Sequence, residues 1–259
     1  MSFYVATLKR LIASGKLDPA APTLVVAGGP YDRDCLVEAG FSEVTISNLD
    51  VRMKGDEFAP FAWSFQDAEA LDFPDQSFDQ VIEHAGLHHC GSPHRGLLEM
   101  YRVARKAVLV FENRDSLLMR AAVKLGLTHY YEIEAVADND GEFGGVRNTA
   151  VPNYVYRWTE REVEKTIASN DPAGPVEVSF FYGMRLPTER LALHRSPVRK
   201  LASQMVTVPA ILFAKLFPKQ SNEFAFLVEK KKQYWPWIDR ETGKLGTEWS
   251  SKKFKVAQK

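Results

Sequence analysis

Cysteine is scarce in this sequence, and so are long apolar runs. The only two cysteines among the 259 residues are Cys35 and Cys90, which is too few for a disulfide framework. The amino terminus lacks the basic start and apolar core of a secretory signal. No apolar run approaches the roughly 20 residues of a membrane span. These absences favour a cytoplasmic protein in a reducing environment.

An excess of charge of one sign is also missing. Lys and Arg total 33, Asp and Glu total 33, and the net charge is therefore zero. Proteins that bind nucleic acid usually carry a basic excess, so a nucleic-acid partner is not expected. The hydrophobic content of 45% is that of an ordinary globular protein, long enough for one large domain or two small ones.

Residues 23–32 carry the most informative local pattern. An apolar run breaks into the pair Gly28 and Gly29 and leads into a helix-like segment. This pattern is typical of a buried parallel strand that feeds a tight turn at the start of a helix. Glycines there let the backbone approach a ligand, and nucleotide-like cofactors bind at such turns in doubly wound α/β folds.

Strands and helices alternate through the first half of the chain. We predict strands over 23–27, 44–48, 78–83 and 107–111, with a further short strand and turn within 65–77. We predict helices over 3–15, 33–39, 94–105 and 117–127, and a helix that starts at Thr159 with a capping-box pattern to Glu162. Strands over 176–182 and 222–229 follow. The alternation favours a parallel sheet with right-handed crossovers.

Four segments carry a resemblance to a known family. They span 27–32, 46–50, 67–79, and 86–89 followed by 99–102. Together they resemble class I S-adenosylmethionine-dependent methyltransferases, and are most similar to the branch of the ubiquinone and menaquinone biosynthesis C-methyltransferases. The third segment is the most specific, and the resemblance covers about residues 20–115.

The resemblance implies an α/β fold: a doubly wound, mostly parallel seven-stranded sheet with an antiparallel last strand. It implies a methyltransferase domain over about residues 1–230, with a lid at about 116–158 and an insertion at about 188–218. A polar carboxy-terminal tail over 231–259 lies outside this domain.

The resemblance also implies where S-adenosylmethionine binds. In the family the glycine turn faces the methionine half of the cofactor, which here corresponds to Ala27, Gly28 and Gly29. Asp67 and Ala68 match the positions that hold adenine, because a carboxylate can accept from the exocyclic amine. The alternative for Asp67 is an ordinary turn residue.

The residue at the position that binds ribose in the family is not an acid in this sequence. In the family an acid at the end of strand 2 holds the ribose hydroxyls, and here Asn48 stands there, followed by Leu49 and Asp50. An asparagine oxygen can still accept from one hydroxyl. Asp50 either contributes to this site or caps a helix.

Two further departures concern the glycine turn. Val25 stands where the family usually has an acid, and Tyr31 replaces the last glycine of the loop. Tyrosine does not easily adopt a positive φ, so either the loop takes another path or Tyr31 covers the cofactor. Glu83 and His84 fall at the carboxyl end of a strand, where such sheets bind ligands, and we predict that both contact the cofactor.

Histidines are concentrated in one place. Four of the six lie within eleven residues, as His84, His88, His89 and His94. A hydroxyl or acidic-carbon acceptor needs a base, and histidine suits this near neutral pH. We predict that His84 and His89 are the candidates for the base and that His88 contacts the substrate. The alternative for each histidine is an ordinary hydrogen-bonded role. A zinc site is not expected, because no matching carboxylate or cysteine spacing beyond Cys90 accompanies them.

The acceptor site is predicted from residues after strand 107–111. Glu112 and Asn113 follow that strand, and Tyr154 and Arg157 belong to the segment where the family inserts its substrate lid. Aromatic residues with arginine suit a sugar or a phosphorylated ligand. A packed loop with ordinary core aromatics explains the same residues equally well.

Basic residues flank apolar ones over 196–217. This pattern predicts weak contact with a membrane surface, or equally a helix packed on the sheet.

We expect methyl transfer from S-adenosylmethionine to a small molecule, with a hydroxyl of a glycan or lipid-linked glycan as the leading acceptor. A quinone-like carbon is the first alternative. The second, from another class, is a catalytically silent scaffold or partner protein, which the departures at Val25 and Tyr31 allow. The oligomeric state stays open.

Overall fold

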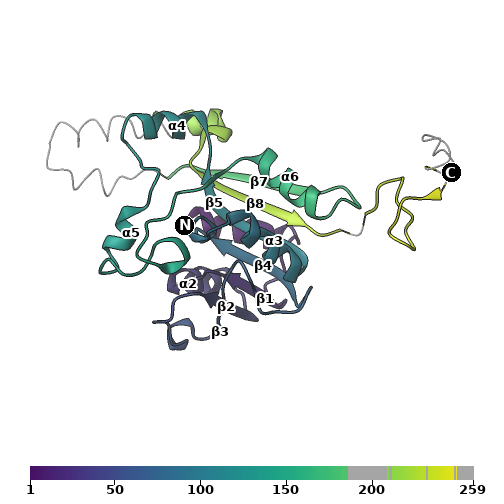
Figure 1. The fold of residues 1–259 in the computed structure, drawn as a ribbon, viewed down its shortest axis with the longest axis horizontal. Helices are drawn as coiled ribbons and strands as arrows, with labels where there is room; N and C mark the ends of the chain where they lie inside the picture. Colours follow the sequence, from purple (N-terminus) through teal and green to yellow (C-terminus); the bar gives the residue numbers. More distant parts are fainter. Residues whose placement is uncertain (186–208, 210–211, 232, 248, 250–259) are drawn as a thin grey trace, which may run out of the picture.

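The computed structural model describes residues 1–185, 209, 212–231, 233–247 and 249. An eight-stranded sheet forms its centre (Figure 1). Seven strands lie in the order β3 (Ala62–Phe65), β2 (Val44–Asn48), β1 (Thr23–Val26), β4 (Phe78–His84), β5 (Ala104–Arg114), β8 (Glu223–Glu229) and β7 (Glu177–Gly183). The eighth, β6 (Arg157–Trp158), pairs with the end of β5.

All neighbours in this sheet are parallel except those of β8, which runs antiparallel to both β5 and β7. This arrangement confirms the predicted doubly wound, mostly parallel fold with an antiparallel last strand. The predicted count of seven misses only β6, whose two residues are too few to show a periodicity.

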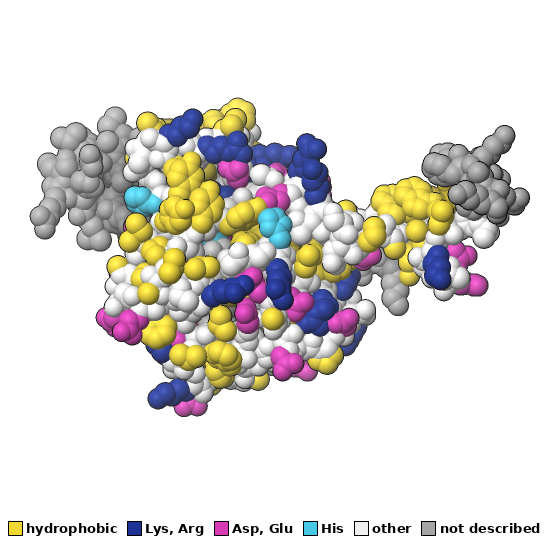
Figure 2. Space-filling view, viewed as in Figure 1, with side chains coloured by type: hydrophobic (Ala, Val, Ile, Leu, Met, Phe, Trp, Pro, Cys, Tyr) yellow, Lys and Arg dark blue, Asp and Glu magenta, His cyan; other side chains and the backbone are white. Residues whose placement is uncertain are grey.

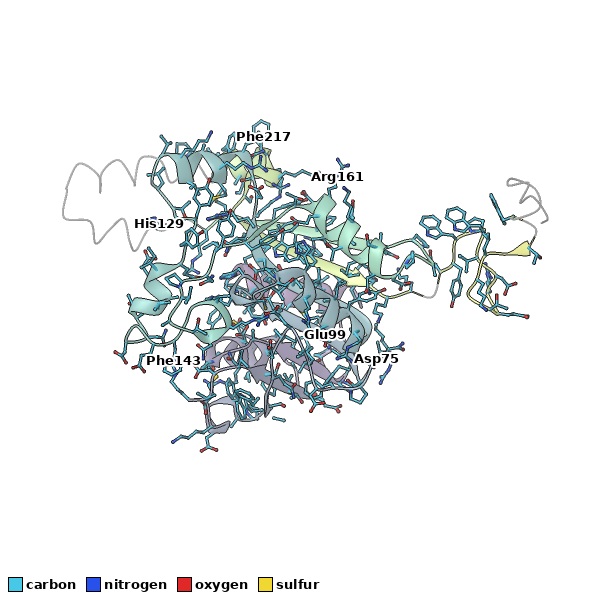
Figure 3. The ribbon with its side chains drawn as sticks, in the orientation of Figure 1. Asp75, Glu99, His129, Phe143, Arg161 and Phe217 are labelled. Carbon is cyan, nitrogen blue, oxygen red and sulfur yellow. The ribbon has the colours of Figure 1, made fainter. Side chains whose placement is uncertain are left out.

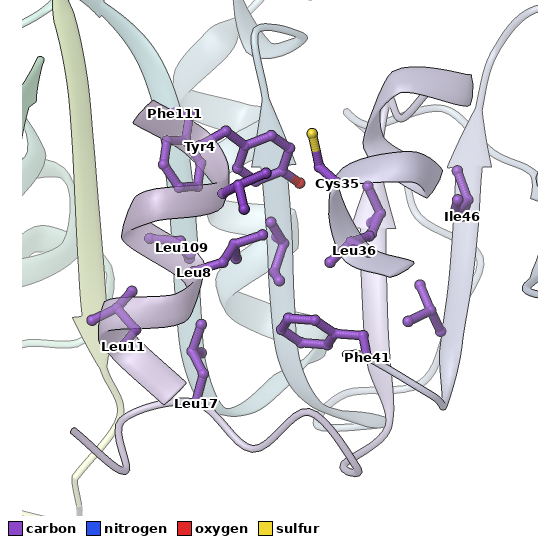
Figure 4. Packing of buried hydrophobic residues seen from close by; sticks show 14 of the residues in the cluster. Tyr4, Leu8, Leu11, Leu17, Cys35, Leu36, Phe41, Ile46, Leu109 and Phe111 are labelled. Carbon is purple, nitrogen blue, oxygen red and sulfur yellow. The ribbon is translucent and has the colours of Figure 1, made fainter. Parts of the chain in front are cut away.

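Helices cover both faces of the sheet. On one face lie α1 (Phe3–Ala13) and α2 (Pro30–Ala39), which pack side by side on the strands (Figure 4). On the other lie α3 (Pro93–Val103) and α6 (Glu160–Asn170). Each layer covers its own buried apolar cluster, and the sheet separates the two clusters.

Local sequence explains where these helices begin and end. The Ser2 hydroxyl caps α1 by accepting from the Val5 amide at 3.3 Å. Proline occupies the first turn of α2, which is why this helix starts at Pro30, three residues before the predicted start. The helix ends where Gly40 adopts a left-handed φ of 88°.

Several predicted boundaries differ from the structure, most clearly at β3 and at the junction of α3 and β5. The strand sought within 65–77 is β3, which ends at Phe65. The predicted helix 94–105 ends at Val103, because β5 already begins at Ala104. Arg105 and Lys106 of β5 pair with Asp79 near the start of β4.

The predicted lid contains α4 (Leu117–Lys124), α5 (Ile133–Ala137) and the 3₁₀ turn η3 (Val146–Asn148). The other 3₁₀ turns, also of three residues, are η1 (Asp56–Phe58), η2 (Leu87–His89) and η4 (Pro218–Gln220). Most of the predicted insertion 188–218 lies outside the described residues; residues 212–216 are helical. The described part of the tail extends away from the body in Figure 1, and its Trp235 and Trp237 rings stack at 5.1 Å.

Neither cysteine forms a disulfide. Within the described residues, every helix is too short or too polar to cross a membrane.

Candidate cofactor and acceptor site

The carboxyl ends of β1 and β4 form two strained turns side by side. Ala27 and Ala85 have φ of 54° and 56°, in the left-handed region that costs a non-glycine residue about 1–3 kcal/mol. A Cβ added at Gly86 would lie 2.5 Å from the Cβ of Ala27, so only glycine fits there. Backbone strain of this kind concentrates at ligand sites, and this is the edge where the sequence predicts the cofactor.

The glycine pair at the end of β1 is bonded within the protein. The Gly28 amide donates to the Ser47 carbonyl at 2.9 Å, and the Gly29 amide donates to Asp32 Oδ2 at 2.8 Å. A Cβ at Gly28 would lie 2.7 Å from Val25 Cγ1 and 2.8 Å from Ile46 Cγ2. Gly28 is therefore required by core packing, and the Val25 departure fills the space beneath the turn.

Tyr31 departs from the family pattern because the loop takes another path. It is the second residue of α2, so the helix begins directly after the glycine pair. Its side chain is half exposed, and its ring centroid lies 5.5 Å from that of His84. Tyr31 therefore flanks the predicted site without needing a positive φ.

At the end of β2 the predicted ribose residues are engaged by the protein. Asn48 Nδ2 donates to the Gly28 carbonyl at 2.9 Å, and its Oδ1 accepts from the Asp50 amide at 2.9 Å. Asp50 forms a two-pronged ion pair with Arg52, which lowers the pKa of Asp50. Leu49 lies between these two residues. Of the two, Asn48 is the nearer to the glycine turn.

At the predicted adenine position, Asp67 Oδ1 accepts the Glu69 amide at 2.9 Å, and Ala68 is buried on the α3 side of the sheet. The buried Glu69 was not predicted. It accepts the Gly91 amide at 2.8 Å and pairs with Arg147 of the lid at 2.8 Å. Burial opposes ionisation of Glu69, but these hydrogen bonds lower its pKa. The predicted lid segment is thus tied to the predicted adenine position.

His84 lies under an aromatic cover. Its ring stacks on Tyr4 with centroids 4.5 Å apart and planes 1° apart, and burial lowers its pKa to about 4. His84 Nδ1 lies 3.8 Å from Asp32 Oδ1. Burial raises the pKa of Asp32 to about 6, and its Oδ1 has no hydrogen-bond partner among the described residues. His84 is therefore neutral at pH 7, beside an acid that titrates near neutrality.

Asp32 was missed by the sequence analysis. The signal that could have found it is the capping box, an acid three positions after the residue that precedes the helix. Glu83, which was predicted, is fully buried, and burial together with the nearby Glu112 raises its pKa well above the ordinary value. Its Oε1 accepts from the Leu87 amide at 3.0 Å, while its Oε2 is without a partner among the described residues.

The structure brings three predicted residues together with one that was missed. Glu112 accepts from both the His88 amide and His88 Nδ1, at 3.0 and 2.7 Å. His88 Nε2 and His89 Nε2 lie 3.3 and 3.4 Å from Glu132 Oε2 of the lid. Burial opposes the charge on His88, but Glu112 raises its pKa, whereas burial lowers the pKa of His89. His94 lies apart and pairs with Glu162 at 3.1 Å.

A cavity of about 290 Å³ lies between α4, α6 and other residues of the lid. Tyr154 and Arg157, both predicted, line it, and Asn113 pairs with Arg157 in the sheet. The Tyr154 ring stacks on Tyr130 with centroids 5.9 Å apart. The other lining residues are Asp115, Met119, Arg120, Val123, Tyr156 and Glu162.

The cavity adjoins the histidine cluster through one stretch of the lid. Asn153, next to Tyr154, donates to the His88 carbonyl at 3.2 Å. Arg157 donates to the His129 carbonyl at 2.9 Å. Figure 3 shows His129 below α4, and Phe143 at the lower end of the lid. The acceptor-side residues therefore form one continuous region along the lid.

The sheet order and the ligand edge define a class I methyltransferase fold. Residues 36–111 match a family model described as a methyltransferase domain. A search of curated proteins finds no significant match. The family match over residues 36–111 and the shared fold support S-adenosylmethionine-dependent methyltransferase activity, and the ubiquinone and menaquinone branch stays a prediction.

Solved structures show the same fold. The chain is similar to magnesium protoporphyrin IX methyltransferase from Synechocystis PCC 6803 with bound SAH, at 14% identity over 88% of this chain and 82% of that chain, with a TM-score of 0.51. It is similar to the YcgJ protein from Bacillus subtilis at 13% identity over 88% and 99%, with a TM-score of 0.52. The cyclase SpnF aligns at 18% identity over 87% and 80%, with a TM-score of 0.50. At these identities the likeness concerns the fold.

The edge fits the cofactor, S-adenosylmethionine. The cofactor carries a sulfonium and an amino group, and the edge offers two buried carboxyl oxygens without partners, Asp32 Oδ1 and Glu83 Oε2. Gly86 lies close to Ala27 and has no side chain, so a ligand can lie close to the backbone there. The residues that would hold the cofactor are those of the glycine turn, Asn48, Asp67 and Glu83.

Proposed function

We propose that the enzyme methylates a hydroxyl of a small acceptor that binds in the lid cavity, with a glycan or lipid-linked glycan as the leading class. The observation that carries this proposal is the lining of the cavity by three tyrosines and two arginines. Tyrosine faces pack well on sugar rings, and arginine forks bind phosphate groups. The cofactor supplies an activated methyl group, and the chain aligns the acceptor and excludes water.

A hydroxyl acceptor must lose its proton, and we propose His84 or His89 as the base. His84 is neutral at pH 7 and can receive a proton, with Asp32 close enough to stabilise the resulting charge. His89 is partly exposed and lies at the lid. Both residues follow β4, on the edge that the cofactor residues share.

Two other functions have some support. Met119 and Val123 line the same cavity, and such apolar contacts favour a quinone-like acceptor that is methylated on carbon. A silent scaffold is the alternative of another class, since one fold can host several functions. Binding of S-adenosylhomocysteine without any methylated product would favour the scaffold.

We also propose weak contact with a membrane surface next to the cavity. Hydrophobic side chains gather over α4 and the lid on the face seen in Figure 2. Of the predicted segment 196–217, residues 209 and 212–217 are described. Exposed apolar residues there adjoin basic ones, as in interfacial helices. The apolar ones are Leu212, Phe213, Leu216 and Phe217, and the basic ones are Lys215 and Lys219. Such contact would suit a lipid-linked acceptor.

Arg157→Gln tests the acceptor site. With a phosphorylated glycan acceptor and labelled cofactor, we expect KM for the acceptor to rise about tenfold or more while cofactor affinity is unchanged. Arg161→Gln, an exposed arginine of α6 labelled in Figure 3, is the matched control and should behave like the wild type. Equal KM values in the two variants would move the acceptor out of this cavity.

A further inference from the structure

Three donor atoms converge on one point between the β4 edge and the lid. They are His88 Nε2, His89 Nε2 and one carboxylate oxygen of Glu132, and all lie within 4.8 Å of one another. The two histidines are consecutive in the turn η2, whereas Glu132 directly precedes α5. The spacing of histidines alone predicted no metal site, because the carboxylate comes from a distant part of the chain.

The separations of the two histidine nitrogens from the Glu132 oxygen match a tetrahedral metal site. With metal–nitrogen and metal–oxygen bonds of roughly 2.0–2.1 Å, two ligand atoms of a tetrahedral zinc ion lie roughly 3.3–3.4 Å apart. The observed distances from Glu132 Oε2 to His88 Nε2 and His89 Nε2 are 3.3 and 3.4 Å. Ion pairing alone would favour shorter contacts of about 2.7–2.9 Å between a charged nitrogen and a carboxylate oxygen.

The groups around the donors orient them for a metal. His88 Nδ1 lies 2.7 Å from Glu112 Oε2, so the ring can donate its Nδ1 proton there and direct the Nε2 lone pair at the common point. The His89 ring is held by a hydrogen bond to the Gly145 backbone. Asn153 Nδ2 lies 3.4 Å from Glu132 Oε2. A carboxylate behind a ligating histidine is a common arrangement around zinc.

We infer that His88, His89 and Glu132 bind a divalent transition metal, with zinc as the best fit to two imidazoles and one carboxylate. A His89 ring that ligates the metal through Nε2 is not available as a base, so in the metal-bound protein the proposed base is His84. Three protein ligands leave a fourth position, and the partial exposure of His89 and Glu132 leaves it accessible. Because Glu132 belongs to the lid and the histidines to the β4 edge, the metal joins the lid to the sheet.

Zinc binding to the metal-free protein tests this inference directly. Zn²⁺ is titrated against a chromophoric chelator, and metal content is measured after dialysis. We expect one zinc per chain in the wild type and an affinity at least about a hundredfold lower in Glu132→Gln and in His89→Asn. Glu112→Gln, behind His88, should lower the affinity by about 10–100-fold. Co²⁺ in place of zinc should give the visible absorption of a tetrahedral site.

His94→Asn is the matched control, because it breaks a similar histidine–carboxylate pair that lacks a second histidine. It should keep the full zinc affinity. Circular dichroism and S-adenosylhomocysteine binding check that each variant is folded. Absence of stoichiometric zinc in the wild type, or wild-type zinc affinity in either Glu132→Gln or His89→Asn, would overturn the site. These measurements use no acceptor, so they are independent of the proposed methyl transfer.

Discussion

The sheet with its first helices and the lid are built on different interactions. Helix α1 buries five residues against the sheet, whereas α4 buries none and α5 buries only Val136. The lid is connected to the body through polar pairs instead: Arg52 with Asn139, Glu69 with Arg147, and His88 with Glu132. The predicted cofactor edge is therefore fixed by apolar packing, and the predicted acceptor side by interactions that water and salt weaken.

The largest expected effect is on the body. Gly28→Val places a branched side chain where Val25 and Ile46 already lie within 2.8 Å. We expect the free energy of unfolding to fall by more than about 3 kcal/mol, measured by urea denaturation. Gly29→Ala is the control, because the nearest atom to its Cβ is 4.0 Å away. If Gly28→Val kept the wild-type stability and lost only cofactor binding, the turn would be a ligand surface and not a packing element.

A pH effect should appear at the same edge. The folded protein holds the pKa of Asp32 at about 6, against an ordinary value of 3.8. A raised acid pKa means that the folded state loses stability as pH rises from about 4 through 6, since the unfolded chain ionises more readily. Asp32→Asn should remove about 3 kcal/mol of this pH dependence.

The measurement for Asp32 is the free energy of unfolding from pH 4 to 7.5. Asp34→Asn serves as the control, because Asp34 is an exposed aspartate of the same helix that pairs with Arg33. Its pH curve should parallel that of the wild type. Parallel curves for Asp32→Asn and the wild type would show that the Asp32 carboxyl is solvated.

The position of the base decides which region performs the chemistry. His84 belongs to the sheet edge and stacks on Tyr4, whereas His89 faces the lid. Substituting the true base by alanine should lower turnover by roughly a hundredfold or more, with cofactor affinity nearly unchanged. Single-turnover rates and S-adenosylhomocysteine affinities of His84→Ala and His89→Ala separate the two. Wild-type turnover in both variants would leave alignment, or a base from the lid, as the remaining explanation.

The smallest effect is expected from a single lid contact. Arg147→Gln removes the exposed partner of the buried Glu69, which keeps its bonds to the Gly91 and Ser92 amides. We expect faster amide exchange in the lid and not in β1 or β4. Arg161→Gln is the control. Exchange that quickens equally in lid and sheet would mean that the two regions unfold as one unit.

Much of the body could be predicted from local sequence, because its signals are local. The glycine pair before α2, the serine caps and the apolar runs of β1, β2 and β4 each act within a few residues. The alternation of strands and helices predicted the parallel pairing of these strands. The predictions failed where the sequence signal was short, as at β6, or mixed, as at the charged start of β5.

The candidate site divides in the same way. Sequence alone was enough to predict the fold class, and the predicted ligand edge and candidate histidines likewise rest on residue type and order along the chain. Only the tertiary structure brought Tyr4 onto His84, buried Asp32 enough to raise its pKa, and placed Glu132 beside His88 and His89. Burial and convergence are properties of distant segments packed together, and no local pattern in the chain encodes them.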